Sequence, residues 1–260
     1  MNAARDVAEL FTLKGRVLLV TGARRGLGWE VAQLAASAGA HVVLNDIDVE
    51  AVEARVAELQ SEGLSASASA FDVTDHAVVR RSIDAIVEAL GSIDIVVNNA
   101  GIQNRKSFVD YAPEEWEAIM RVHVTGSFNV SQAAVRHMAR KKFGRIVMVS
   151  SVVATSVRGT LGPYAAAKGA IASLTRELAQ EFGPQGITCN AIAPGFLATE
   201  FTSAMVENAE FCGWIEKRVP MGRWGLPGDV APAVIYLASA AGAFVNGAVL
   251  TIDGGLLAGL

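Results

Sequence analysis

A tyrosine and a lysine four positions apart are the residues of this sequence best suited to proton transfer. Tyr164 and Lys168 stand at i and i+4 of a predicted helix over residues 164–182, so they share one helix face. A phenol with its ordinary pKa near 10 is a weak base at neutral pH, and a nearby ammonium is expected to lower that pKa. Ser151, at the end of a predicted strand, is placed to hold a substrate oxygen beside the phenol. Because such a pair alone is common on protein surfaces, its meaning depends on the rest of the chain.

A glycine-rich turn follows the first predicted strand, residues 16–21, and opens a predicted helix over residues 28–38. Glycines let the backbone turn tightly and approach a pyrophosphate, and the free N–H groups at a helix N-terminus attract its charge. We therefore expect this turn to bind the phosphates of a dinucleotide. The residues predicted to do so are Gly22, Arg25, Gly26, Leu27 and Gly28.

The choice between the two nicotinamide cofactors depends on an acidic residue and a basic one. Asp46 ends the second predicted strand, where a carboxylate accepts hydrogen bonds from ribose hydroxyls and repels a 2′-phosphate. Arg25 is a contrary signal, because a cation in the glycine turn attracts that phosphate. We weigh the carboxylate more heavily, so the sequence favours NAD(H), with NADP(H) as the alternative.

Two further strand ends carry polar or small residues that are expected beside the same cofactor. Asp72 and Val73 follow the third predicted strand, and Asn99, Ala100 and Gly101 follow the fourth. The carboxyl ends of parallel strands meet at one sheet edge, where ligands bind in this architecture. Either segment taken alone is equally compatible with an ordinary turn.

The elements that position these residues alternate along the chain. Short apolar runs without polar alternation are typical of strands buried on both faces of a parallel sheet. They cover residues 16–21, 40–46, 65–71, 93–98, 144–150, 186–191 and 248–252. Helical patterns lie between them, at residues 28–38, 49–60, 77–90, 114–141 and 164–182. This alternation predicts an α/β fold with a doubly wound parallel sheet and helices on both faces.

The whole chain, residues 1–260, is expected to form a single domain, because no linker, repeat or low-complexity tract divides it. Residues 196–225 break the alternation with aromatic, acidic and glycine residues. An insertion of this length is typically a functional lid, here one that would cover the substrate, although a purely structural excursion is the alternative.

Composition excludes several classes of function. Of the 260 residues 52% are hydrophobic and 18% charged, and the net charge of -4 comes without a basic block. This balance argues against nucleic acid or an anionic membrane as a partner. The two cysteines form neither a disulfide framework nor a metal-ligand cluster, so no metal is expected. No signal peptide or membrane span is recognisable, and we expect a cytoplasmic protein.

Together these motifs resemble the short-chain dehydrogenase/reductase family over residues 13–255, a stretch that also includes Pro194, Gly195 and Thr199. The resemblance implies a seven-stranded Rossmann sheet, hydride transfer at C4 of a nicotinamide, and a homotetramer. It implies that Tyr164 is the acid/base and that Ser151 positions the carbonyl or alcohol. It places Lys168 at the nicotinamide ribose and Thr199 at the carboxamide end of the cofactor, with Pro194 and Gly195 beside it.

One position departs from the family pattern. The family usually has an asparagine in the helix after its Asn-Asn-Ala-Gly motif, where it helps hold a water that links the lysine to solvent. This chain has His123 instead. A histidine can take part in such a proton path and titrate near pH 6–7, or it can be a buried packing residue.

Within the family, several stretches are similar to gluconate 5-dehydrogenases and related sugar-acid reductases. A sugar acid requires a cation for its carboxylate, ideally a guanidinium, and Arg105 and Arg158 are the candidates near the predicted pocket. The alternative substrate is another ketone, such as a 3-oxoacyl thioester, a steroid or a xenobiotic ketone. A catalytically silent nucleotide-binding protein is the remote alternative, since Ser151, Tyr164 and Lys168 are intact.

Overall fold

The computed structural model describes residues 7–259, which build one seven-stranded parallel sheet with the strand order β3-β2-β1-β4-β5-β6-β7. The strands are β1 (Val17–Thr21), β2 (His41–Asn45), β3 (Ala66–Ala68), β4 (Ile95–Asn98), β5 (Gly144–Val149), β6 (Ile187–Pro194) and β7 (Val249–Ile252). The predicted doubly wound parallel sheet is therefore confirmed. The predicted third strand was too long, because only three of its residues pair with β2.

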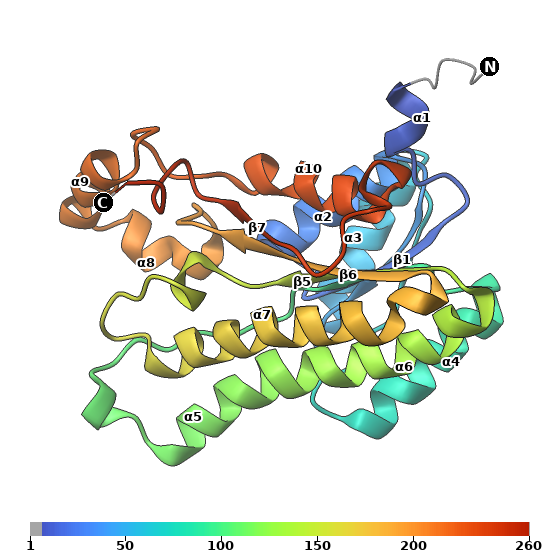
Figure 1. The fold of residues 1–260 in the computed structure, drawn as a ribbon, viewed down its shortest axis with the longest axis horizontal. Coiled ribbons are helices and arrows are strands. Elements are labelled where there is room, and N and C mark those ends of the chain that lie inside the picture. The colour runs from blue at the N-terminus through green and yellow to red at the C-terminus, as the bar shows by residue number, and fades with distance from the viewer. Residues whose placement is uncertain (1–6, 260) are drawn as a thin grey trace.

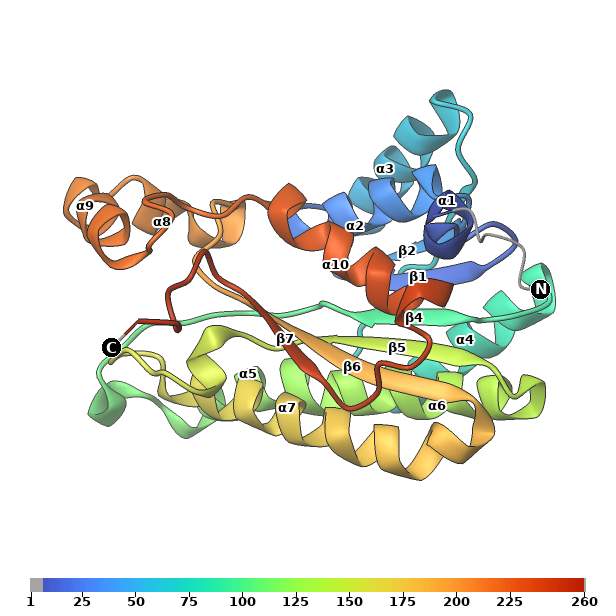
Figure 2. The same ribbon diagram turned by 45° about the horizontal axis from the view of Figure 1, so that its top comes forward.

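Helices cover both faces of the sheet (Figures 1 and 2). One layer contains α2 (Gly26–Ser37), α3 (Val49–Ser61) and α10 (Pro227–Ala238), and the other contains α4 (His76–Leu90), α5 (Pro113–Met120), α6 (Gly126–Lys141) and α7 (Gly162–Phe182). Two buried apolar clusters fill the space between sheet and helices. Successive residues of β1 alternate between them: Leu18 faces one cluster and Leu19 the other. This double burial explains why the strands are apolar throughout.

The long helix predicted over residues 114–141 is interrupted. Between α5 and α6 lies η2 (Arg121–Thr125), a single turn of π-helix. Such insertions are rare in helices and are frequent at functional sites. Gly126 follows this turn, and a Cβ added there would lie 2.7 Å from a methyl carbon of Val73. The bulge therefore brings His123 and the start of α6 against the ends of the central strands.

Residues 196–225, the predicted lid, form η5 (Glu200–Thr202), α8 (Ser203–Val206) and α9 (Ala209–Arg218) before the chain enters α10. They extend beyond the carboxyl edge of the sheet (Figure 1). Among residues 7–259, no helix is long and apolar enough to cross a membrane.

Candidate active site

The strand order reverses between β1 and β4, and the carboxyl ends of these strands open into a cavity of about 530 Å³. This is the position at which doubly wound sheets bind ligands. Among the residues that line it are Gly22, Arg25, Gly26, Leu27, Asp46, Asp72, Val73, Asn99, Ala100, Gly101, Arg105, His123, Ser151, Tyr164, Lys168, Pro194, Gly195 and Thr199. The structure thus brings together all the predicted site residues except Gly28 and Arg158.

The glycine turn leaves room for a backbone-bound ligand but not for side chains. Gly22 has φ +67° and a Cβ added there would lie 2.9 Å from the Cα of Ala100. Gly28 lies inside α2, where an added Cβ would collide with the carbonyl of Gly22. Gly28 therefore serves close packing of the helix on the turn rather than contact with the cavity. The N-terminus of α2 at Gly26 faces the cavity, and this cradle fits a pyrophosphate.

The adenosine end of the cavity contains a cation that the sequence analysis did not single out. Arg24 lines the cavity beside Asp46, and its Nε lies 3.7 Å from the Asp46 carboxylate. Its Nη1 donates a hydrogen bond of 2.8 Å to Asp48, which also caps α3. The preference for NAD(H) assumed that the Asp46 carboxylate is an unpaired anion, but the structure pairs it with Arg24. The signal available in the sequence was the pair of adjacent arginines in the glycine turn, Arg24 and Arg25.

Tyr164 lies in the first turn of α7, opposite Ser151 at the end of β5. Burial raises the pKa of Tyr164 to about 12, although a hydrogen bond with Ser151 and the charge of Arg105 act in the opposite direction. Lys168 is not among the groups that lower this pKa, contrary to the expectation from its spacing. The phenol is protonated at neutral pH and is suited to donate its proton to a substrate oxygen.

Lys168 is buried one helical turn farther along α7. Its Nζ lies 5.4 Å from the centroid of the Tyr164 ring and donates a hydrogen bond of 2.6 Å to the carbonyl of Val149. Burial lowers the pKa of Lys168 to about 7. The Ser150 hydroxyl fixes the same turn by donating to the Lys168 carbonyl at 3.0 Å. The amine can thus gain or lose a proton near neutral pH at the inner wall of the cavity.

His123 projects from the π-helical turn and is 2% exposed. Its ring meets the Tyr164 ring edge-on at 5.3 Å between centroids, and its Nε2 lies 2.7 Å from the carbonyl oxygen of Ile102. Burial, and secondly the charge of Lys168, lower the pKa of His123 to about 3 against the effect of the Ile102 carbonyl. Of the two expected roles of His123, this environment favours the buried packing residue over a group that titrates near pH 6–7. A neutral imidazole that donates to Ile102 fits this environment.

The two arginines proposed for a substrate carboxylate occupy different places. Arg105 lines the cavity, and within residues 7–259 its buried Nε has no hydrogen-bond partner. Burial, and secondly the nearby charge of Arg158, lower the pKa of Arg105. Arg158 does not line the cavity. Its guanidinium stacks over Phe211 at 4.7 Å and Trp214 at 4.5 Å from the ring centroids.

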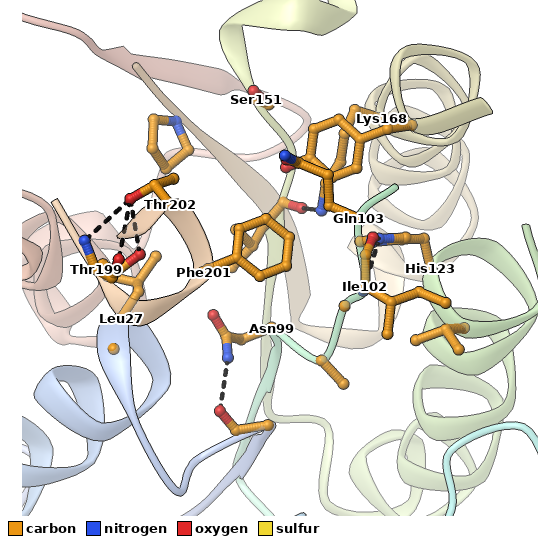
Figure 3. A pocket seen from close by; sticks show the side chains of 18 of the residues that line it. Leu27, Asn99, Ile102, Gln103, His123, Ser151, Lys168, Thr199, Phe201 and Thr202 are labelled. Atoms are coloured by element: carbon orange, nitrogen blue, oxygen red, sulfur yellow. Dashed lines mark hydrogen bonds between the residues drawn. The ribbon is translucent and has the colours of Figure 1, made fainter. Parts of the chain in front are cut away.

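Other cavity residues besides Arg24 were not predicted as site residues. Gln103 and Phe201 both line the cavity, and the Phe201 ring lies 6.4 Å from that of Tyr164. Figure 3 shows Phe201 between Leu27 and Thr199 on one side and Gln103 and His123 on the other. Phe201 belongs to the predicted lid, residues 196–225, and Gln103 follows the predicted Asn99–Gly101 turn, but a single sequence does not show which side chains of these segments turn inward.

Known proteins share this sequence and architecture over almost the whole chain. The family model described as enoyl-(acyl carrier protein) reductase matches residues 22–257. A 5-keto-D-gluconate 5-reductase of Escherichia coli is 41% identical over 96% of this chain and 98% of its own. A gluconate 5-dehydrogenase of Gluconobacter oxydans is 42% identical over 97% and 98%.

Among solved structures, a gluconate 5-dehydrogenase from Burkholderia cenocepacia in complex with NADP and tartrate is 43% identical. It superposes with a TM-score of 0.96, covering 98% of this chain and all of that one. The chain belongs to the short-chain dehydrogenase/reductase family. It is an NAD(P)-dependent oxidoreductase that transfers a hydride between the cofactor and a secondary alcohol or ketone.

The burial of His123 predicts an acid sensitivity that a variant can remove. The folded-state pKa of about 3 lies below the unfolded value of 6.5, so the unfolded chain binds more protons and stability falls as pH falls below 6.5. Between pH 7 and 5 this histidine costs about 2 kcal/mol of unfolding free energy. His123→Asn is expected to lose correspondingly less stability over that interval, measured by urea unfolding at each pH.

The pH dependence, not the absolute stability, is the readout, because His123→Asn also changes packing. His41, whose pKa burial also lowers, is present in both proteins and cancels in the comparison. Equal losses in wild type and variant would show that His123 becomes protonated in the folded protein.

Proposed function

We propose that the protein interconverts D-gluconate and 5-keto-D-gluconate. The observation that carries this proposal is the guanidinium of Arg105, whose buried Nε has no hydrogen-bond partner among the described residues, in the same cavity as Ser151 and Tyr164. A sugar-acid carboxylate supplies the anion that such a group lacks. The names of the relatives from Escherichia coli and Gluconobacter oxydans support the same substrate.

In the direction of reduction, the Tyr164 hydroxyl gives its proton to the ketone oxygen while Ser151 donates a hydrogen bond that orients the carbonyl. When bound, the nicotinamide supplies or accepts the hydride. Lys168, with a pKa of about 7, is placed to return a proton toward the phenol side of the cavity. In the direction of oxidation the same groups run in reverse, and the positive charge of the oxidised nicotinamide then favours the phenolate.

His123 has a supporting part in this proposal. Its edge-on contact with Tyr164 and its hydrogen bond to Ile102 fix the floor of the site. A neutral imidazole remains able to hydrogen-bond a water, so the protein's proton path does not require a histidinium.

The wild type is expected to reduce 5-keto-D-gluconate with consumption of reduced cofactor. Tyr164→Phe keeps the ring but removes the transferable proton, so kcat should fall by roughly 10² or more while cofactor still binds. Turnover is measured by absorbance of the reduced cofactor, and cofactor binding by quenching of tryptophan fluorescence.

A panel of competing ketones completes this test. Faster turnover of a 3-oxoacyl thioester or a steroid ketone than of 5-keto-D-gluconate would overturn the proposed substrate. Undiminished turnover in Tyr164→Phe would instead overturn the role of the phenol while leaving the substrate in place.

We infer that NADP(H) is the preferred cofactor, in contrast to the preference for NAD(H) inferred from Asp46 alone. Arg24 lies between Asp46 and Asp48 and offsets the repulsion of a 2′-phosphate. Arg25 adds a second cation that lines the same end of the cavity. The NADP in the relative from Burkholderia cenocepacia supports this preference.

A cofactor comparison checks the inference. The wild type is expected to show a higher kcat/KM with NADP⁺ than with NAD⁺. Arg24→Ala should lower kcat/KM about tenfold with NADP⁺ but little with NAD⁺, because a charge-assisted hydrogen bond to phosphate contributes about 1.5–3 kcal/mol. Arg81→Ala serves as the control, because Arg81 is an exposed residue of α4 that does not line the cavity. A wild type that is more efficient with NAD⁺ would mean that Asp46 dominates.

We further propose that residues 196–225 act as the lid of the substrate, and that the protein works as a homotetramer in the cytoplasm. Exposed apolar side chains lie on two separate surfaces: Trp116 and Phe128 on α5 and α6, and Phe244 and Leu250 beside or on β7. Two self-complementary surfaces are what a closed tetramer of two-fold interfaces requires. The free thiols Cys189 and Cys212 fit a reducing compartment.

Size-exclusion chromatography with light scattering tests the assembly. The expected mass is about four times that of the 27.2 kDa chain. Phe128→Glu is expected to give dimers, because it places a charge in one interface and leaves the other intact. A monomeric wild type would overturn the tetramer.

A further inference from the structure

The lid is closed at its base, where its first and last residues meet. A bridge between Leu197 and Gly225 closes the segment, with Ala198 N–H donating to the Gly225 carbonyl at 2.9 Å and Gly225 N–H to the Phe196 carbonyl at 2.9 Å. The other end of the lid, α9, has no such backbone bridge among the described residues. Its position over the protein therefore depends on side chains.

Those side chains form an aromatic cluster made of Phe196, Phe211, Trp214 and Trp224. The rings of Phe211 and Trp214, both on α9, lie 5.5 Å and 5.6 Å from that of Phe196. Phe196 follows Pro194, the last residue of β6, and Gly195, so the cluster holds α9 against the base of the lid, where the chain leaves the sheet.

Arg158 contacts this cluster from a different part of the chain. It belongs to the exposed loop between η3 (Val152–Ala154) and α7, which leads from Ser151 to Tyr164. Its guanidinium stacks on both α9 rings, at 4.7 Å and 4.5 Å from their centroids. No carboxylate pairs with it within residues 7–259. The segment that precedes Tyr164 therefore meets α9 in two ways: Val152, Val153 and Leu161 share a buried apolar cluster with Ile215 of α9. Arg158 adds a guanidinium whose charge is not neutralised by an acid among the described residues.

The Arg158 loop is also tied to the loop that carries Arg105. Thr160 has φ +73°, a left-handed conformation that a β-branched residue adopts only under constraint. Its carbonyl accepts hydrogen bonds from the Tyr111 hydroxyl at 3.1 Å and from Lys106 N–H at 3.3 Å. Lys106 directly follows Arg105. A movement of the Arg105 loop or of the Arg158 loop therefore displaces the other loop through the hydrogen bonds to the Thr160 carbonyl.

The two guanidinium groups interact electrostatically as well. The charge of Arg158 contributes, after burial, to lowering the pKa of Arg105. Two like charges at close range disfavour the arrangement in which both loops are closed, and an anion beside Arg105 offsets that repulsion.

We propose that Arg158 is a positioning residue that latches α9 over the substrate end of the cavity, and that a substrate carboxylate held by Arg105 stabilises the latched state. This inference rests on the proposed sugar-acid function. It makes lid closure depend on the charge of the substrate: D-gluconate closes the lid, whereas a neutral polyol of the same length does not. Arg158 thereby contributes to specificity without touching the substrate.

Kinetics of the full-length protein provide the first test. Arg158→Ala is expected to raise the KM for D-gluconate about tenfold, which corresponds to about 1.4 kcal/mol, while the KM for NADP⁺ changes less than twofold. Arg81→Ala should leave both constants unchanged. The same measurement on Trp214→Leu and on the double variant Arg158→Ala/Trp214→Leu completes a double-mutant cycle. If Arg158 is a latch on Trp214, the double variant should raise the KM for D-gluconate little more than one single variant does. If Arg158 instead binds the carboxylate directly, the effects of the two single variants on the free energy that corresponds to KM should add.

Fluorescence tests the dependence on charge without turnover. In the Tyr164→Phe protein saturated with NADP⁺, D-gluconate is expected to change the fluorescence emission of Trp214. The contribution of Trp214 is the part of the emission that is lost in the double variant Tyr164→Phe/Trp214→Phe. D-glucitol, which is neutral, should leave that emission unchanged, and Arg158→Ala should abolish the response to D-gluconate.

The outcomes separate the two proposals. A wild type that does not turn over D-gluconate overturns the proposed function. Wild-type turnover combined with an unchanged KM in Arg158→Ala, additive effects in the cycle, or equal responses to gluconate and glucitol overturns the latch alone.

Discussion

The side-chain amide of Asn99 holds together the two strand ends on which the whole site depends. Its Nδ2 donates to the carbonyls of Thr21 at 2.9 Å and Gly22 at 3.0 Å, and the Thr21 hydroxyl accepts from the N–H groups of Asn99 and Ala100, both at 3.0 Å. These bonds fix β1 and β4 side by side at the point where the strand order reverses. The steric demand for glycine at positions 22 and 28 follows from this close approach. A cleft shaped by main chain can bind a pyrophosphate with little dependence on side chains.

Burial sets the protonation states around this cleft. The same desolvation that raises the pKa of Tyr164 to about 12 lowers those of Lys168 to about 7 and His123 to about 3. All three groups are thus biased toward their neutral forms near pH 7. A neutral phenol is suited to donate a proton, which is the role proposed for Tyr164 in reduction. In the proposed oxidation, the positive charge of a bound oxidised nicotinamide would favour the phenolate.

Much of this architecture was predictable because its signals are local. Buried parallel strands appear as continuous apolar runs, and the glycine turn and the Tyr164–Lys168 spacing are contiguous in the sequence. What failed depended on contacts between distant segments. The π-helical turn before Gly126 and the pairing of Arg24 with Asp46 arise from packing that no spacing encodes. The same packing buries His123, which was one of the two roles expected for it. Arg158 illustrates this most clearly. Its residue type suggested that it binds a carboxylate, yet its guanidinium stacks on Phe211 and Trp214, which lie more than fifty positions later in the sequence.

The two ends of the cavity are built on different principles, and this difference bears on substrate choice. The cofactor end is formed by strand termini and backbone, which the sheet holds rigid. The substrate end is formed by Gln103, Arg105 and Phe201, on segments outside the sheet that contact one another through Thr160, Arg158 and α9. Substitutions there can change the substrate without disturbing hydride transfer. The sugar-acid substrate proposed above rests on this end of the cavity, where the buried Nε of Arg105 has no hydrogen-bond partner among the described residues.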